Sequence, residues 1–417
     1  MKRTSLLLGF YGLSVGIYAQ QAVIIKEEKY SAPKSCATEH IYDKKAQLHD
    51  NFIYLNSDRE TPKGTYDIHV ISNETCKDEK KSKGLKFIWS AYPSFNFLVS
   101  PDKKMALALE YSQPNYGLPK FMGTHVINQN GDLVWSEEWS LKAGDAELEM
   151  ISAGVDDNAN ALFFVRAKQK EGTSHAIVYR NAETGKYKII PYSLDVNGRV
   201  TFRANFDDKG NIHFMGAFSR RDSKETGETK RGVFHGKVDP KSEGSLNTTL
   251  YPFEETGRFD SEWKLKDYFV DEEGNITLCA LGQYAKSGAG RDFSKLFILQ
   301  LDNEGKEKWS HVITTVNLMR EPTLGEGRFC RFGNSYGYIY FDNADYIKYT
   351  NGIDPKEVSS EPKLNELQMY LVDASGKLSK KAVAPIEMFR KNTGPGYKET
   401  EDALYVTGKD TDKKITW

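Results

Sequence analysis

Residues 124–136 read THVINQNGDLVWS, and this stretch carries the pattern that decides the fold. A short run of β-forming residues leads into Asn128, a glycine follows at Gly131, and a second such run ends with Trp135 and Ser136. An Asx residue with a glycine shortly after it, between two β-forming runs, is typical of the tight turn of an antiparallel hairpin. The stretch therefore predicts a β-hairpin.

The same pattern recurs along the chain, at Asp208-Lys209-Gly210, Asp271-Glu272-Glu273-Gly274, Asp302-Asn303-Glu304-Gly305 and Asp373-Ala374-Ser375-Gly376. One blade is expected to use 52–55, 66–70 and 85–89, and the next 95–99, 105–109, 124–127 and 133–135. Later second strands are expected at 161–165, 212–215, 276–278, 338–341 and 403–406, about 50 to 65 residues apart. This spacing suits a four-stranded blade with one enlarged loop. The sequence therefore predicts an all-β fold, a β-propeller of four-stranded antiparallel blades, with seven blades favoured and six as the alternative.

The final blade is short of one strand, because the chain ends at Lys414-Ile415-Thr416-Trp417. The run Ala22-Val23-Ile24-Ile25 can supply it. Pairing the N-terminal with the C-terminal strand would close the ring and remove exposed strand edges.

Three expected fourth strands carry a Trp-Ser pair, at Trp89, Trp135 and Trp309. In the last two, the tryptophan follows the turn glycine at the same spacing, which indicates a repeated packing position between neighbouring blades. This Gly-x-x-x-Trp arrangement resembles the tryptophan-docking repeats of quinoprotein-like propellers and, loosely, WD40-like repeats. The resemblance implies a propeller fold, and we expect no quinone or other cofactor.

The N-terminus has the features of a secretory signal peptide. Lys2 and Arg3 precede a short apolar run over 6–17, and Ala19 offers a small residue for cleavage. The run is shorter than the roughly 20 residues that a membrane-spanning helix needs. We therefore expect a signal peptide at 1–19, a single propeller domain at 20–417 and no membrane span after cleavage. The junction resembles those of secreted Bacteroidota propeller proteins, so the protein is expected in the periplasm, at the cell surface or outside the cell.

The charge balance limits the classes of binding partner, and the cysteines limit the possible disulfides. Removing Lys2 and Arg3 leaves 55 basic against 58 acidic residues, a formal charge of −3 with both signs interspersed. Such a chain has no long-range attraction for nucleic acid, so an envelope protein or a glycan is the expected partner. Cys36 and Cys76 could form a disulfide, which bacterial export permits but does not require. Cys279 and Cys330 lie in strand-like runs and are expected to be small buried side chains.

The expected b–c connections are long and polar, whereas the a–b and c–d connections are mostly tight. Because b–c and d–a connections emerge on one face of a propeller, that face should carry the recognition loops. The candidate binding residues on these loops are Tyr111, Tyr116, Arg220, Arg221, Tyr284, Arg291, Tyr346 and Tyr349.

Four arginines fall in or beside innermost strands, namely Arg199, Arg203, Arg328 and Arg331. They predict a basic channel lining that could attract a carboxylate or sulfate. Comparable positions hold Glu147, Glu149, Asp267 and Glu399, so the alternative is ion pairing between blades.

Three patterns that resemble catalytic or metal-binding motifs lack the structural context that such motifs need. The segment 333–337 matches G-x-S-x-G, but a strand follows it where a nucleophile elbow needs a helix, so it is interpreted as a hairpin turn. His69, His125, His175 and His235 fall in third strands, away from the propeller axis, and are expected to be structural. The acidic turns lack the regular oxygen spacing of a calcium-binding loop. A single structural calcium ion in the channel is the remaining alternative.

These observations favour an exported, non-catalytic propeller that binds a protein or glycan through its b–c loop face. The alternative is a glycan or peptide hydrolase with paired carboxylates at the channel mouth. Fold alone does not separate the two.

Overall fold

The computed structural model describes residues 23–28, 45–48, 51–56, 65–72, 75, 77–86, 94–112, 120–139, 142–143, 146–169, 172–194, 198–221, 229–253, 263–283, 293–316, 327–351, 365–389, 395–399, 403–408 and 412–417. The signal-peptide region, Cys36, Cys76 and Trp89 lie outside these residues. None of the helices in the described part of the chain has the length and apolar character needed to cross a membrane.

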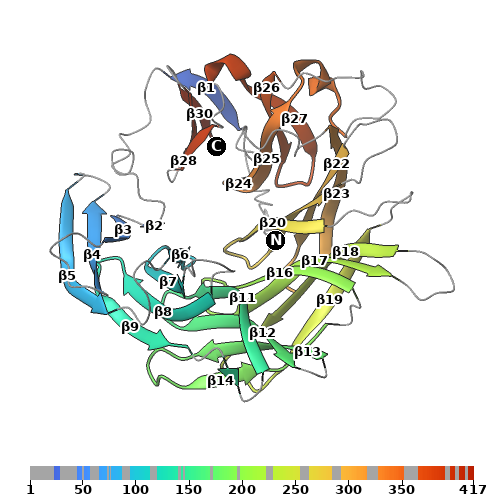
Figure 1. The fold of residues 1–417 in the computed structure, drawn as a ribbon. Helices are drawn as coiled ribbons and strands as arrows, with labels where there is room; N and C mark the ends of the chain where they lie inside the picture. The colour runs from blue at the N-terminus through green and yellow to red at the C-terminus, as the bar shows by residue number, and fades with distance from the viewer. Residues whose placement is uncertain are drawn as a thin grey trace, which may run out of the picture.

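Seven sheets follow one another along the chain and are arranged as a ring (Figure 1). We number them as blades in chain order. Blade 1 contains β2 (Lys45–Gln47), β3 (Asn51–Asn56), β4 (Thr65–Ser72) and β5 (Asp78–Lys86), and blade 2 contains β6 (Ser94–Val99), β7 (Met105–Ser112), β8 (Lys120–Asn128) and β9 (Leu133–Glu138). Blade 3 contains β10 (Lys142–Ala143), β11 (Ala146–Val155), β12 (Ala161–Gln169), β13 (Gly172–Arg180) and β14 (Tyr187–Ile190).

Blade 4 contains β16 (Gly198–Phe206), β17 (Ile212–Arg221), β18 (Thr229–Val238) and β19 (Leu246–Phe253), with β15 (Tyr192–Ser193) parallel to β19. Blade 5 contains β20 (Trp263–Val270), β21 (Ile276–Gln283), β22 (Phe293–Leu301) and β23 (Glu307–Val316). Blade 6 contains β24 (Arg328–Phe332), β25 (Ser335–Asp342), β26 (Glu366–Val372) and β27 (Leu378–Pro385), with the short 3-10 helices η2 (Ala344–Lys348) and η4 (Ile386–Met388). Blade 7 contains β28 (Gly396–Glu399), β29 (Ala403–Thr407), β30 (Asp412–Thr416) and β1 (Ile24–Glu28).

This architecture confirms the all-β propeller and the count of seven blades. The predicted ring closure is also present, because β1 pairs antiparallel with β30, from Ile24 opposite Thr416 to Glu28 opposite Asp412. Val23, just before β1, is buried in the same apolar cluster as Ile415. The first segment of the described chain therefore completes the last blade.

Blade 1 differs from the expected pattern at both ends. The structure has an additional innermost strand, β2, and its outermost strand β5 runs over Asp78–Lys86 where 85–89 was expected. Strand β5 is rich in charged residues, and its pairing with β4 defines it, with Ile71 opposite Asp78 and Thr65 opposite Lys86. An outermost strand buries little apolar surface, so hydrophobic patterning placed it poorly.

The a–b turns repeat one hydrogen-bond arrangement. In blades 3, 4 and 5 an aspartate carboxylate accepts the backbone N–H two and four residues later, and the asparagine at the fourth position donates its side-chain N–H to the second carboxylate oxygen. Gly210 and Gly274 adopt φ of 79° and 85° in these turns, a region that favours glycine. Blade 3 holds Ala159 there, at a φ of 62°. The repeated Asx and glycine pattern thus reflects a local backbone requirement.

Fourth-strand side chains dock on the turn of the next blade. Trp135 of β9 donates its indole N–H to the Ala159 carbonyl at 2.8 Å. Trp309 of β23 packs against Gly376, where a Cβ would meet the indole at 2.7 Å, and His311 bonds the Gly376 carbonyl at 2.8 Å. These contacts confirm the predicted packing position between blades for Trp135 and Trp309.

Two smaller predictions are also confirmed. Cys279 and Cys330 are buried side chains in β21 and β24. The G-x-S-x-G segment forms the hairpin between β24 and β25, with Phe332 paired opposite Ser335 and Ser335 itself buried. A buried serine in a hairpin cannot serve as an exposed nucleophile.

Candidate functional site

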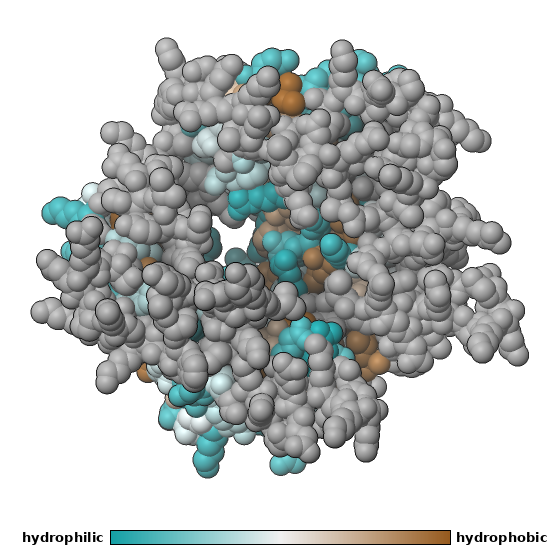
Figure 2. Space-filling view, in the orientation of Figure 1, coloured by the Kyte–Doolittle hydropathy of each residue, from teal (hydrophilic) through white to brown (hydrophobic). Residues whose placement is uncertain are grey.

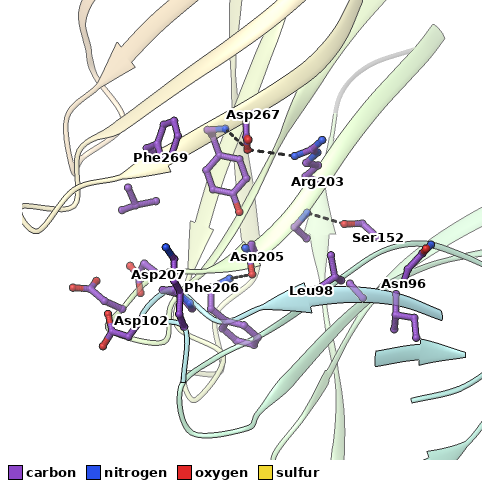
Figure 3. A pocket seen from close by; sticks show the side chains of 18 of the residues that line it. Asn96, Leu98, Asp102, Ser152, Arg203, Asn205, Phe206, Asp207, Asp267 and Phe269 are labelled. Carbon is purple, nitrogen blue, oxygen red and sulfur yellow. Dashed lines mark hydrogen bonds and ion pairs between the residues drawn. The ribbon is translucent and has the colours of Figure 1, made fainter. Parts of the chain in front are cut away.

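A cavity of about 840 Å³ occupies the centre of the ring. Figure 2 shows the opening at the centre, with hydrophilic and hydrophobic side chains mixed on its visible wall. The innermost strands β6, β11, β16 and β20 supply most of the lining, and Figure 3 shows side chains from these strands around the cavity. One end of the cavity is formed by the a–b turns at 101–103, 207–208 and 271–272, and we call this side of the propeller the smooth face.

A second cavity of about 460 Å³ adjoins it. This cavity is lined by Arg203, Lys264, Leu265, Lys266, Asp267, Gly327, Arg328, Phe329 and Tyr397. Most of these residues lie at the beginnings of β20, β24 and β28, which is the end of the blades where the d–a and b–c connections emerge. We call this end the loop face and this space the loop-end cavity.

Arg203 and Asp267 line both cavities and form an ion pair across blades 4 and 5, with Nη1 to Oδ1 at 3.4 Å (Figure 3). Their side chains are 49% and 48% exposed, so solvent screens the attraction. The predicted alternative of ion pairing between blades therefore holds for Arg203.

A β-bulge in β20 shapes this part of the channel. The register with β21 shifts between Leu265 and Asp267, which leaves Lys266 as the extra residue. A bulge breaks the alternation of a strand, so consecutive side chains can point the same way. Lys266 and Asp267 are both partly exposed and both line the loop-end cavity, while Leu265 is buried.

The two ends of the channel differ in charge. At the smooth face the larger cavity is lined by five acidic side chains, Asp102, Asp207, Asp208, Asp271 and Glu272, and by two basic ones, Lys103 and Arg331. The loop-end cavity has four basic side chains, Arg203, Lys264, Lys266 and Arg328, and one acidic side chain, Asp267. An anion entering from the loop face therefore meets a positive potential first.

Asp207 connects the cavity to a buried histidine pair. Its carboxylate lies 3.1 Å from His213 Nε2, and His213 Nδ1 lies 3.1 Å from His235 Nε2. Burial opposes ionisation of Asp207, but hydrogen bonds from His213 and Asn211 hold its pKa below the usual range. Burial lowers the pKa of His213, partly offset by Asp207, and lowers that of His235 further. Both imidazoles are therefore neutral near pH 7, with Asp207 ionised.

A second buried network holds the b–c connection of blade 6. Lys380 and Asp342 have fully buried side chains 2.7 Å apart, and Lys380 Nζ also donates to the Tyr346 carbonyl at 3.0 Å. Gln368 donates to the Asn343 carbonyl at 2.9 Å. These contacts fix η2, so this part of the loop face is built on a rigid support.

His125 also has a structural setting, in blade 2. Its Nδ1 lies 2.8 Å from Ser136 Oγ and its Nε2 lies 3.1 Å from Glu110 Oε2, across the neighbouring strands β9 and β7. His125 and Glu110 are fully buried. Among the described residues, no group of three or more His, Cys, Asp or Glu side chains is arranged to hold a metal ion.

The predicted loop-face residues are dispersed in the structure. Tyr111 is half-buried on β7 and lines the larger cavity. Tyr346 is 6% exposed and Tyr349 packs beside it with ring centroids 5.9 Å apart, so Tyr346 belongs to the interior. Arg220 and Arg221 end β17, and their side chains are not described. Tyr116, Tyr284 and Arg291 lie outside the described residues.

Three of the four predicted channel arginines line the cavities. Arg203 and Arg331 line the larger cavity, and Arg203 and Arg328 line the loop-end cavity. Arg199 is on β16, with no side-chain placement described. Lys264 and Lys266 were not among the predicted site residues. Their Lys-x-Lys spacing indicates a basic pair, but the bulge that places Lys266 on the cavity wall has no local signal.

The fold and the channel define a seven-bladed β-propeller with a charged central passage. No protein-family model matches the chain, and no curated protein sequence is significantly similar to it.

Solved structures that resemble it include the polysaccharide lyase Uly1, with 11% identity, 90% of this chain and 89% of that chain covered, and a TM-score of 0.45. The WD40 domain of SCAP from fission yeast has 7% identity, 94% and 98% coverage, and a TM-score of 0.30. A Synechocystis apocarotenoid oxygenase has 12% identity, 82% and 70% coverage, and a TM-score of 0.37. Similarity at this level carries no argument about activity.

Proposed function

We propose that the chain is an exported, non-catalytic binding protein that holds a protein or glycan partner at its loop face. The observation that supports this proposal most directly is the loop-end cavity, where basic side chains from three blades gather around a space open to that face. Rigid support for η2 beside β25 and β26 fits a binding surface presented on a preformed scaffold.

Three channel carboxylates have structural partners, which leaves them less suited to act as the acid and base of a hydrolase. An acid and base pair for glycoside hydrolysis needs two carboxyl groups that face the scissile bond, roughly 5 to 9.5 Å apart. Asp207 and Asp271 accept hydrogen bonds from their own turns, and Asp267 pairs with Arg203. These three carboxylates thus have structural partners. Asp208 and Glu272 also line the larger cavity, and they are the carboxylates that the hydrolase alternative would have to use.

The proposal is tested by affinity capture with residues 20–417 as bait in an envelope extract, followed by cross-link mapping. Cross-links from Lys120, Lys230 or Lys286 to one reproducible partner are the expected result. Cross-links only from Lys209 and Lys306, which lie on turns of the smooth face, would contradict the assignment of the face. Release of reducing sugars or peptides by the purified chain would instead support hydrolysis.

A further inference from the structure

We infer that the loop-end cavity is an anion site that takes the carboxylate or sulfate groups of an acidic glycan. This inference rests on the proposed function and names the ligand class of that face. It uses the described lining residues, whose basic members outnumber the acidic one by four to one.

The basic side chains converge from separate elements. Arg203 comes from β16, Lys264 and Lys266 from β20, and Arg328 from β24. Convergence from three adjacent blades gives a concave site rather than a charged surface strip. Guanidinium groups bind carboxylate and sulfate oxygens through two parallel N–H bonds, and lysines add point charges beside them.

Asp267 acts as an internal competitor for Arg203. The pair is long, at 3.4 Å, and about half exposed on each side. Exposed pairs of this kind contribute little net stability, so an incoming anion can take the place of Asp267 at small cost. The bulge at Lys266 keeps the lysine and the carboxylate on the same wall, where a ligand meets both.

Tyr397 favours a sugar over an acidic peptide. Its ring lines the cavity, and the guanidinium of Arg328 lies 5.1 Å from the ring centroid, which orients the charge toward the same space. Tyr397 packs against a buried apolar cluster and Arg328 lies over its ring, so the part of the ring that stays exposed is the contact for a sugar whose acidic substituent binds the cations.

The test is calorimetric titration of the mature chain with tetragalacturonate. Its fully methyl-esterified form, with the same sugar ring and blocked carboxylates, is the matched control ligand. Binding of the acid and none of the ester is expected. Arg328→Gln should weaken binding about tenfold or more, since a hydrogen bond to a charged group is lost. Asp267→Asn should strengthen it by up to about fivefold, since the competitor is removed.

Lys209→Gln, on a smooth-face turn, is the control variant and should leave binding unchanged. Far-ultraviolet circular dichroism and thermal unfolding check that each variant keeps its fold. Equal binding of acid and ester, or binding unaffected by both Arg328→Gln and Asp267→Asn, would overturn the inference. Tighter binding of polyglutamate than of tetragalacturonate would also overturn it, in favour of an acidic peptide. If no oligosaccharide binds but captured proteins cross-link to the loop face, the inference fails while the proposed function stands.

Discussion

Replacing Lys380 with methionine preserves most of the side-chain volume and removes one charge from a fully buried pair. Asp342 Oδ2 then loses the ammonium at 2.7 Å and retains the Tyr340 hydroxyl at 2.9 Å. The Tyr346 carbonyl loses its donor at 3.0 Å. Burial lowers the pKa of Lys380, and Asp342 opposes that shift by favouring the charged ammonium. The ionised form of Lys380 is therefore stabilised by Asp342.

Breaking a buried ion pair by removing one partner costs about 3–5 kcal/mol of unfolding free energy, because the remaining charge is left uncompensated. Both side chains are 0% exposed, so solvent does not reduce this cost. The double variant Asp342→Asn with Lys380→Met should cost less than Lys380→Met alone, because no charge remains buried and the amide oxygen can still accept from the Asn343 N–H. It should retain a loss of about 1–3 kcal/mol from the unpaired Tyr346 carbonyl.

The assay is urea unfolding followed by tryptophan fluorescence, for the two single variants and the double variant. Lys306→Met, at an exposed pair with Glu304, is the control and should change little. Hydrogen exchange at 344–348 should accelerate in Lys380→Met, because η2 loses an anchor. Additive losses in the double variant would refute the reasoning, since they would show that the two charges are not coupled.

Three further outcomes are expected. Gly210→Ala should lower stability by about 1–2 kcal/mol in thermal unfolding, because φ at this position is 79°, and Gly210→Asn should lose less. The free energy of unfolding should fall as pH drops below about 6.5, because the depressed pKa values of His213 and His235 mean that the unfolded chain binds more protons. The double variant His213→Asn with His235→Gln should show a flatter pH profile of stability in urea titrations. An unchanged profile would contradict this account. Deleting residues 20–28 should expose the edge of β30 and produce dimers or aggregates in size-exclusion chromatography, which a synthetic peptide of that segment should reverse.

The fold was predictable because its main determinant is local. An Asx residue and a glycine at close spacing mark the same kind of turn in several blades, so the turn at Gly210 was predicted without knowledge of distant contacts, although Asp207 and not the predicted Asp208 accepts its backbone N–H groups. The closing strand was predictable for a related reason, since an incomplete last blade needs a partner. Strand β5 was misplaced because pairing with β4 defines it, and its charged residues give no apolar signal.

The residues of the candidate site were harder to predict from the sequence than the fold. Asp342 and Lys380 are 38 residues apart in sequence and meet only through the sheet of blade 6. Tyr346 was assigned to a solvent-facing loop, but the η2 helix turns it inward, where it is 6% exposed. The wall position of Lys266 depends on a bulge that nothing in the local sequence marks. Residues whose role depends on distant partners are those that the sequence placed poorly.

The polarity of the channel follows from the turns that build the fold. Aspartate is favoured in the a–b turns of blades 3, 4 and 5 because its carboxylate binds the backbone N–H groups there, and this requirement adds acidic side chains at the smooth-face end of the larger cavity irrespective of any ligand. The opposite ends of the innermost strands carry no such turn, so Lys264, Lys266 and Arg328 reflect a different constraint. A ligand with negative groups is then attracted at one mouth and repelled at the other. If the proposed anion site is correct, an acidic ligand should therefore enter from the loop face, where the basic side chains lie.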